Sequence, residues 1–292
     1  HAHYSPAWAV GGWPGLCLDN DEVKDQAEKF LIAMVKRYRD HPSMGAYDVW
    51  NELNQLGDAG GCYCRASTEK FRTWLKEKYG SLQALNEAWY RYSYVDWEDV
   101  EIPRMRGPYP DSIDYALFRV DNATRLLRWR INVIKKYDQR NPVIAHAIPA
   151  GVLDRVGPKT YPVFQAGRMV DIYGYSGGGQ HDETTHLRWK HWMNMDLIRS
   201  ASQGKPFWCG EMAAGASWGF QGQELDEGRL LNASDVKLYS ITHFAGGARG
   251  IYSPRWRPLQ DGKNMGGFGF YAMDGSPTDR SEAAGEVARW AN

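Results

Sequence analysis

The chain has 292 residues, and its 35 Lys and Arg residues balance its 35 Asp and Glu residues, so its formal net charge is zero. This balance creates no overall field that would recruit nucleic acid or an anionic membrane, and the apolar runs are too short to cross a bilayer. No basic-then-apolar signal segment opens the sequence, and four cysteines are too few for a disulfide scaffold, so the compartment stays open.

Helices and short buried strands are predicted to alternate along the chain. Apolar residues recur at helical spacing, with acidic residues at the start of the first helix and basic residues at its end. Helices are predicted at residues 21–39, 68–79, 81–89, 112–139, 161–167, 183–203, 233–245 and 279–290. Strands are predicted at the start of the chain and at 44–50, 142–146, 169–173, 206–210 and 249–253. This alternation predicts a parallel sheet with right-handed crossovers.

The count of about six strands predicts the fold class, which is α/β. A (β/α)8 TIM barrel has eight parallel strands and a typical length of about 250 residues. We therefore predict one catalytic barrel domain over 1–292 that contains strands three to eight and lacks the first two βα units. A Cys-containing subregion at about 53–111 is inserted after strand four. A doubly wound open sheet of six strands is the structural alternative.

Two of the predicted strands end in a carboxylic acid. Glu52 follows a run that ends in Trp50-Asn51, and Glu211 follows Phe207-Trp208-Cys209-Gly210. Active sites of barrels lie at the C-terminal ends of the strands, so these two acids are expected to share one pocket. Glycoside hydrolysis needs such a pair, and a separation of about 5 Å gives retention, whereas about 9 Å gives inversion.

The same motifs resemble the glycoside hydrolase family 42 β-galactosidases, which are retaining (β/α)8 glycosidases. Trp50-Asn51-Glu52 is similar to the end of strand four in that clan, and residues 207–212 are similar to its nucleophile segment. Residues 62–64 and 71–89 resemble the insertion that follows strand four. The resemblance covers about residues 5–252. It implies that Glu52 is the acid/base, that Glu211 is the nucleophile, and that the enzyme removes terminal β-linked galactose by double displacement.

Further residues near strand ends are candidates for contacts with the sugar. Asn51 is expected to bind the 2-hydroxyl, and Tyr175 is favoured over Tyr173 as a hydrogen-bond donor to Glu211. Tryptophan occurs 13 times, which suits stacking on pyranose rings, although a large aromatic core is the plainer interpretation. The remaining candidates are His3, His146, Trp218 and Trp256.

The resemblance also implies a structural zinc bound by cysteines, whereas no cofactor is predicted for catalysis. Cys17, Cys62 and Cys64 match three of the zinc ligands, but Ser67 stands where the fourth cysteine is expected. A serine hydroxyl is a poor ligand, and structural zinc takes four donors that are mostly Cys or His. Zinc, a disulfide and free thiols therefore all remain open.

The sugar specificity stays open because several galactose-binding residues of the family are missing. Residues 12–16 lack the expected arginine, and residues 261–267 lack the expected Glu and His. A glucoside, a mannoside or an algal galactan is therefore an alternative substrate. The expected partner is an oligosaccharide or β-galactoside, with no nucleic acid and no membrane, and the resemblance implies a homotrimer.

A serine esterase is an alternative from another class. Gly174-Tyr175-Ser176-Gly177-Gly178 fits the nucleophile elbow G-x-S-x-G, and Asp226 and His243 follow in the order of a hydrolase triad. However, Gly179-Gln180 delays the helix that should begin directly after the serine. A carbohydrate-binding domain without activity is the third alternative.

Histidines spaced by five residues do not share one helical face, so they do not form a metal-binding pair. His181, His186 and His191 have this spacing, and we expect them on a solvated helix surface.

Overall fold

The computed structural model describes residues 17–51, 62–90, 93–104, 109–147, 162–177, 188–212, 214–215, 231–253, 255–260 and 269–291. The chain forms two compact units. Unit 1 contains His1–Val49, Leu53–Asn141 and Leu153–Pro162, and unit 2 contains Trp50–Glu52, Pro142–Val152 and Val163–Asn292. Among the described residues, no helix combines the length and the apolar character needed to cross a membrane.

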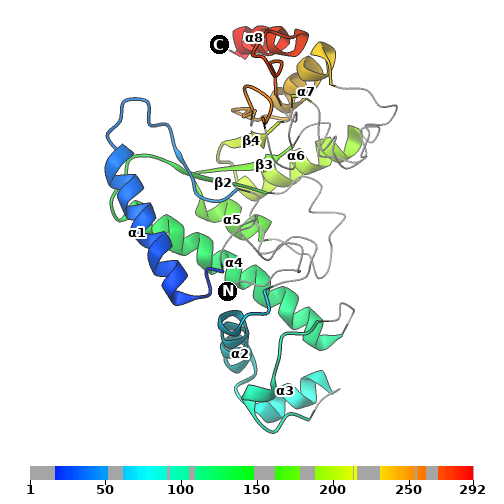
Figure 1. Ribbon diagram of the computed structural model, residues 1–292. Helices are drawn as coiled ribbons and strands as arrows, with labels where there is room; N and C mark the ends of the chain where they lie inside the picture. Colours follow the sequence, from blue (N-terminus) through cyan, green and yellow to red (C-terminus); the bar gives the residue numbers. More distant parts are fainter. Residues whose placement is uncertain are drawn as a thin grey trace. The chain divides into compact units, whose positions relative to one another are not determined.

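Unit 1 is mainly helical. Its elements are α1 (Asp21–Tyr38), β1 (Tyr47–Asp48), α2 (Arg65–Tyr79), α3 (Leu82–Trp89), the 3₁₀ helix η2 (Trp97–Asp99) and α4 (Pro110–Lys135). The Asn20 side chain accepts a hydrogen bond from Val23 N and so caps α1, and Pro110 occupies the first turn of α4, where its missing N–H costs nothing. Helix α1 packs against α4 (Figure 1).

A buried aromatic cluster holds α2, α3 and α4 together. Its members are Phe71, Leu75, Leu85, Trp89, Val100, Ile102, Tyr115 and Phe118. The carboxylate of Asp114, on α4, lies beside this cluster and accepts hydrogen bonds from Tyr79 Oη at 2.7 Å and Trp89 Nε1 at 2.9 Å. It also forms an ion pair with Lys78. A single buried acid therefore links α4 to both shorter helices.

Unit 2 contains a parallel sheet with helices packed against it (Figure 1). Its elements are β2 (Val143–Ala147), α5 (Val163–Met169), β3 (Ile172–Ser176), α6 (Arg188–Ser202), β4 (Phe207–Glu211), α7 (Ala233–Ala245) and α8 (Asp279–Ala291). Strand β3 pairs in parallel with both β2 and β4. A parallel bridge between Cys209 and Ile251 continues the sheet past β4. The prediction of an α/β fold with parallel strands is therefore confirmed.

The predicted start of β3 was wrong. The strand expected at 169–173 is β3 at Ile172–Ser176, because helix α5 continues to Met169. Asp171 lies in the short turn between them, where its carboxylate accepts from Val143 N at 2.8 Å and its own N–H donates to the Val143 carbonyl. These two bonds fix the start of β3 against β2.

The two faces of this sheet differ in character. The ring of Tyr175 lies near the rings of His191 on α6 and His243 on α7, so its face is the one covered by helices. Side chains alternate along a strand, which puts Gly174 and Ser176 on the opposite face. His146 pairs with Gly174 and lies on that same opposite face. In a barrel this opposite face is the interior.

On the helix-covered face, Tyr175 and His243 form a buried hydrogen-bonded pair. His243 Nδ1 lies 2.7 Å from the Tyr239 carbonyl and therefore carries the proton, so His243 Nε2 accepts from the Tyr175 hydroxyl at 2.9 Å. Burial, together with the neighbouring His191 imidazole, lowers the pKa of His243 to about 3. His191 was expected on a solvated surface, and this prediction was wrong because its ring packs on His243 at 4.6 Å between centroids.

The buried His243 makes stability depend on pH. Its pKa falls from 6.5 in the unfolded chain to about 3 in the folded one, so below pH 6.5 the unfolded state binds a proton that the folded state does not. The free energy of unfolding should therefore decrease as the pH falls, by about 2 kcal/mol between pH 8 and pH 5. Urea unfolding of His243→Gln at several pH values should show a flatter dependence, whereas the exposed control His41→Gln should keep the full slope.

Candidate active site

The carboxylate of Glu211 is turned to its face of the sheet by a β-bulge. Tyr175 pairs with Cys209, and the next residue of β3, Ser176, pairs with Glu211, so Gly210 is an extra residue in β4. In a regular strand Glu211, two residues after Cys209, would share the helix-covered face with it. Bulges commonly re-aim a side chain beside an active site. Here the bulge places the acid of β4 on the face opposite the helices, at the C-terminal end of the strand.

Two glycines on neighbouring strands make room for the ring of His146. A Cβ on Gly210 would lie 2.8 Å from His146 Cβ and Cγ, which is closer than real contacts allow. A Cβ on Gly174 would lie 3.2 Å from His146 Cβ. His146 is buried. The structure therefore brings the predicted substrate contact His146 next to the bulge that precedes Glu211.

The neighbour of Glu211 on this face is a serine. Ser176 Oγ donates to Glu211 Oε2 at 3.3 Å, and the Glu211 carbonyl accepts from Gly177 N at 2.8 Å. The Tyr175 hydroxyl instead donates to His243 on the other face. Burial raises the pKa of Tyr175 well above its ordinary value, so this hydroxyl stays protonated. A contact between Tyr175 and the sugar stays a prediction.

The other acidic motif begins beside β2. The carbonyl of Trp50 accepts from His146 N at 3.3 Å, which ties the residue before Asn51 to the strand that carries His146. Asn51 itself is an exposed turn residue. Glu52, His3 and Trp218 lie outside the described residues, so the separation of the two acids stays a prediction. Within unit 2, Trp50, β2, β3 and β4 are joined in sequence by backbone hydrogen bonds.

Two pairs of aromatic rings lie in and after the strands of unit 2. Trp256 is 69% exposed and contacts Tyr271, with 4.5 Å between ring centroids and a tilt of 32° between the rings. Trp208 in β4 contacts Tyr252, with 5.0 Å between centroids. Trp256 is therefore a supported aromatic platform with a free face, which suits its predicted contact with a sugar ring.

The geometry around Ser176 disfavours the esterase alternative. Ser176 is fully buried as the last residue of β3, so its hydroxyl is not exposed as that of an elbow nucleophile would be. Its hydroxyl bonds a carboxylate, whereas His243 Nε2 accepts from Tyr175. Asp226 lies outside the described residues.

Three of the four cysteines form a compact cluster in unit 1. The sulfurs of Cys17, Cys62 and Cys64 lie within 4.8 Å of one another, and all three are free thiols. Cys64 is the N-cap of α2, and its sulfur accepts from Ser67 N at 3.5 Å. The three residues predicted as ligands are therefore brought together, and their donor set fits a thiophilic metal such as zinc. Cys209 is buried in β4, and burial raises the pKa of its thiol to about 12.

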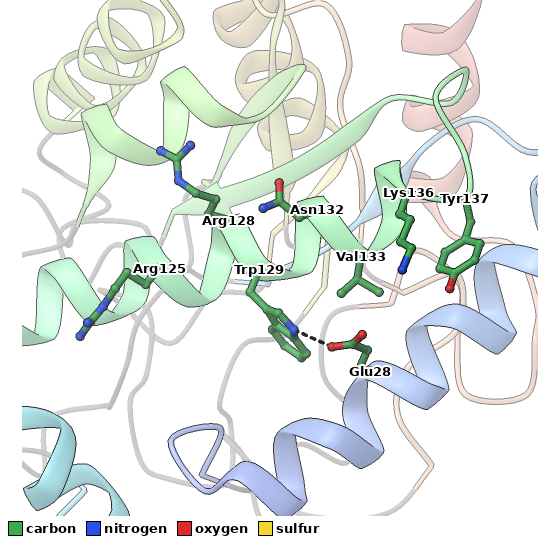
Figure 2. A pocket seen from close by; sticks show the side chains of 8 residues that line it. All are labelled: Glu28, Arg125, Arg128, Trp129, Asn132, Val133, Lys136 and Tyr137. Carbon is green, nitrogen blue, oxygen red and sulfur yellow. Dashed lines mark hydrogen bonds between the residues drawn. The ribbon is translucent and has the colours of Figure 1, made fainter.

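A separate pocket of about 370 Å³ lies between α1 and α4 in unit 1. Figure 2 shows that α4 supplies Arg125, Arg128, Trp129 and Asn132, while Glu28 from α1 accepts from Trp129 Nε1 at 3.0 Å. The pocket contains no strand end and no pair of carboxylates, so it lacks the groups that glycoside hydrolysis needs.

The sequence pattern did not predict the partners of two residues near these sites. Ser176 fits the motif of an esterase nucleophile, but in the structure it contacts Glu211. Strand alternation together with the order of β3 and β4 could have indicated this contact. Asp19 accepts from Ser67 Oγ at 2.6 Å beside the cysteine cluster. Nothing in the sequence pattern connects these residues, which lie 48 positions apart.

Comparison with known proteins gives a consistent answer. The family model of glycoside hydrolase family 42, described as β-galactosidase, matches residues 7–289. β-Galactosidase LacZ of Heyndrickxia coagulans is 26% identical over 274 residues, which cover 91% of this chain and 38% of that protein. β-Galactosidase Bga of Halorubrum lacusprofundi is 26% identical over 294 residues, with 91% and 39% covered.

Solved structures agree on the fold. A β-galactosidase from Bacillus circulans sp. alkalophilus matches with a TM-score of 0.81 at 22% identity, over 96% of this chain and 41% of that one. The chain thus spans about two fifths of the length of the relatives it matches. The family match covers nearly the whole chain, and the parallel strands are those of part of a (β/α)8 barrel. The chain therefore belongs to glycoside hydrolase family 42, the β-galactosidase family.

Proposed function

We propose that this protein is a retaining, exo-acting β-glycosidase that cleaves terminal β-linked galactose. The observation that carries the proposal is the position of Glu211, which a bulge turns to the face opposite the helices at the end of β4. There it would attack the anomeric carbon as nucleophile, while Glu52 would protonate the leaving oxygen and later activate water. Membership of the β-galactosidase family supports galactose as the sugar.

The surrounding residues support this assignment. Ser176 Oγ donates to Glu211 Oε2, which orients the carboxylate. His146 shares the face of Glu211, and Asn51 lies next to the backbone that is bonded to His146, so both are proposed to bind hydroxyl groups of the sugar. Trp256 is proposed to stack on the ring, and the roles of His3, Tyr175 and Trp218 remain predictions.

We further propose that the cysteine cluster binds a structural zinc through Cys17, Cys62 and Cys64. The close approach of their sulfurs supports this, and the ion would stabilise the segments around α2 without taking part in the reaction. Assembly as a homotrimer is also proposed, on the family resemblance alone.

The substrate class can be tested with the natural protein that contains this chain. Aryl β-galactoside should be hydrolysed at least about tenfold faster than the matching glucoside and mannoside, because an exo-site rejects sugars through unpaired hydroxyl contacts. Oligosaccharides of algal galactans extend the panel. Nuclear magnetic resonance at early times should show the β-anomer of the product first, as double displacement requires.

Other outcomes would favour the alternatives. The α-anomer appearing first would indicate an inverting enzyme, and absence of turnover on the whole panel would favour a carbohydrate-binding domain. Hydrolysis of aryl esters that disappears in Ser176→Ala would favour the esterase.

A further inference from the structure

The sulfur of Cys17 lies at the spacing of a tetrahedral zinc site from the other two sulfurs of the cysteine cluster. Cys17 Sγ lies 3.7 Å from Cys62 Sγ and 3.7 Å from Cys64 Sγ. Zinc–sulfur bonds of about 2.3 Å at tetrahedral angles separate two sulfurs by about 3.8 Å. A disulfide would need about 2.0 Å between its sulfurs. Two of the three separations therefore match a tetrahedral site, all three sulfurs lie within 4.8 Å of one another, and a fourth ligand is needed to complete such a site.

The hydroxyl of Ser67 lies at the distances from two of the sulfurs that a fourth ligand requires. Ser67 Oγ is 3.4 Å from Cys17 Sγ and 3.6 Å from Cys64 Sγ. A zinc–oxygen bond of about 2.0 Å beside these zinc–sulfur bonds predicts an oxygen–sulfur separation of about 3.5 Å. Ser67 is 2% exposed, so bulk water has little access to this position. The serine that replaces the expected cysteine thus keeps the geometry of a ligand.

A buried carboxylate compensates for the weakness of a serine as a ligand. Ser67 Oγ donates to Asp19 Oδ2 at 2.6 Å, which leaves the oxygen lone pairs directed away from Asp19. The other carboxylate oxygen, Asp19 Oδ1, accepts from Asn122 Nδ2 on α4 at 2.8 Å. A strong acceptor for the hydroxyl proton raises the electron density on Ser67 Oγ and fixes its orientation, as outer partners do for other metal ligands.

We propose that Ser67 is the fourth ligand of this metal site and that Asp19 is its positioning residue, so that the site binds zinc through three thiolates and one serine oxygen. The inference rests on the zinc site proposed above. On binding, the three cysteines release their protons to water. The Ser67 proton stays in the hydrogen bond to Asp19, and the oxygen supplies a lone pair to the metal.

The test is the zinc affinity of purified variants, measured by competition with a chelating dye and by metal content after dialysis. Ser67→Ala should weaken binding at least about tenfold, and Asp19→Asn should weaken it by about tenfold or more. Ser67→Cys should tighten binding by about tenfold, because a thiolate is the better ligand for zinc. Asp21→Asn removes an exposed carboxylate two residues from Asp19 and should change affinity less than twofold.

A direct count of ligands accompanies the affinities. X-ray absorption of the wild-type zinc protein should show three sulfurs and one oxygen, and Ser67→Cys should show four sulfurs. If wild-type protein binds no zinc or contains a disulfide, the zinc site itself is refuted. If wild type binds zinc but Ser67→Ala and Asp19→Asn bind it equally well, the zinc site stands and the roles of Ser67 and Asp19 are refuted. Should Ser67→Ala fail to fold, Ser67→Cys and Asp19→Asn decide the question.

Discussion

Glu211→Ala is expected to lower kcat on an aryl β-galactoside by about 10⁴-fold or more in the natural protein that contains this chain. The substitution removes the atom that is proposed to bond the anomeric carbon, whereas the proposed acid/base and sugar contacts remain. Azide, a small anion that fits the vacated space, should restore part of the turnover by attacking from the side that Glu211 occupied, and this single displacement should give the α-glycosyl azide. Steady-state kinetics with and without azide provide the measurement.

Ser176→Ala is the matched control for Glu211→Ala. It removes the 3.3 Å hydrogen bond to Glu211 Oε2 but leaves the carboxylate, so kcat should fall only by about tenfold. Glu211→Ala losing less than tenfold in kcat would contradict the role of Glu211. Equal and complete losses in both variants, with no azide rescue, would also contradict it.

Asp114→Ala is expected to destabilise unit 1 by about 3–5 kcal/mol. The Asp114 side chain is 4% exposed and accepts from Tyr79 and Trp89 while pairing with Lys78. Without the carboxylate, the buried indole N–H of Trp89 and the half-buried hydroxyl of Tyr79 lose their acceptor, and the Lys78 amine loses its ion pair. Urea unfolding followed by tryptophan fluorescence measures the loss.

Asp121→Ala is a matched control on the same helix. Asp121 also accepts from an indole, Trp74 Nε1 at 2.8 Å, but this contact is exposed. Its loss should cost less than about 1 kcal/mol, as is usual for surface contacts. If the two variants unfold at the same urea concentration, Asp114 does not link the helices in the way described.

Most helices could be predicted because their apolar spacing and end signals agree. Helix α1 was expected at 21–39 and observed at Asp21–Tyr38, and α7 was expected and observed at 233–245. The start of β3 was misplaced, since Met169 and Val170 form an apolar run that suits the end of a helix as well as a strand. The contacts of Asp171 with Val143 decide between them, and those contacts depend on the neighbouring strand.

The sequence predicts which residue types form the candidate site, but it does not predict the direction in which each side chain points. An acid after a buried run marks the end of a strand, so Glu211 could be placed at the edge of the sheet. Whether Tyr175 lies on the face of Glu211 depends on which side of the sheet the helices cover. In the structure its hydroxyl bonds His243 on the helix-covered side. The hydrogen bond between Ser67 and Asp19 joins segments 48 positions apart. Neither the spacing of apolar residues nor a local sequence motif can predict such a contact.

The bulge in β4 has a consequence for how this strand can change. Because the bulge at Gly210 turns Glu211 to the face opposite the helices, the direction of this side chain depends on where the strand leaves its regular alternation. A substitution at position 210 that removed the bulge, with the number of residues unchanged, would point an intact carboxylate into the helix layer. Substitutions elsewhere in the strand can be absorbed by repacking, so β4 should tolerate altered side chains far better than a lost bulge.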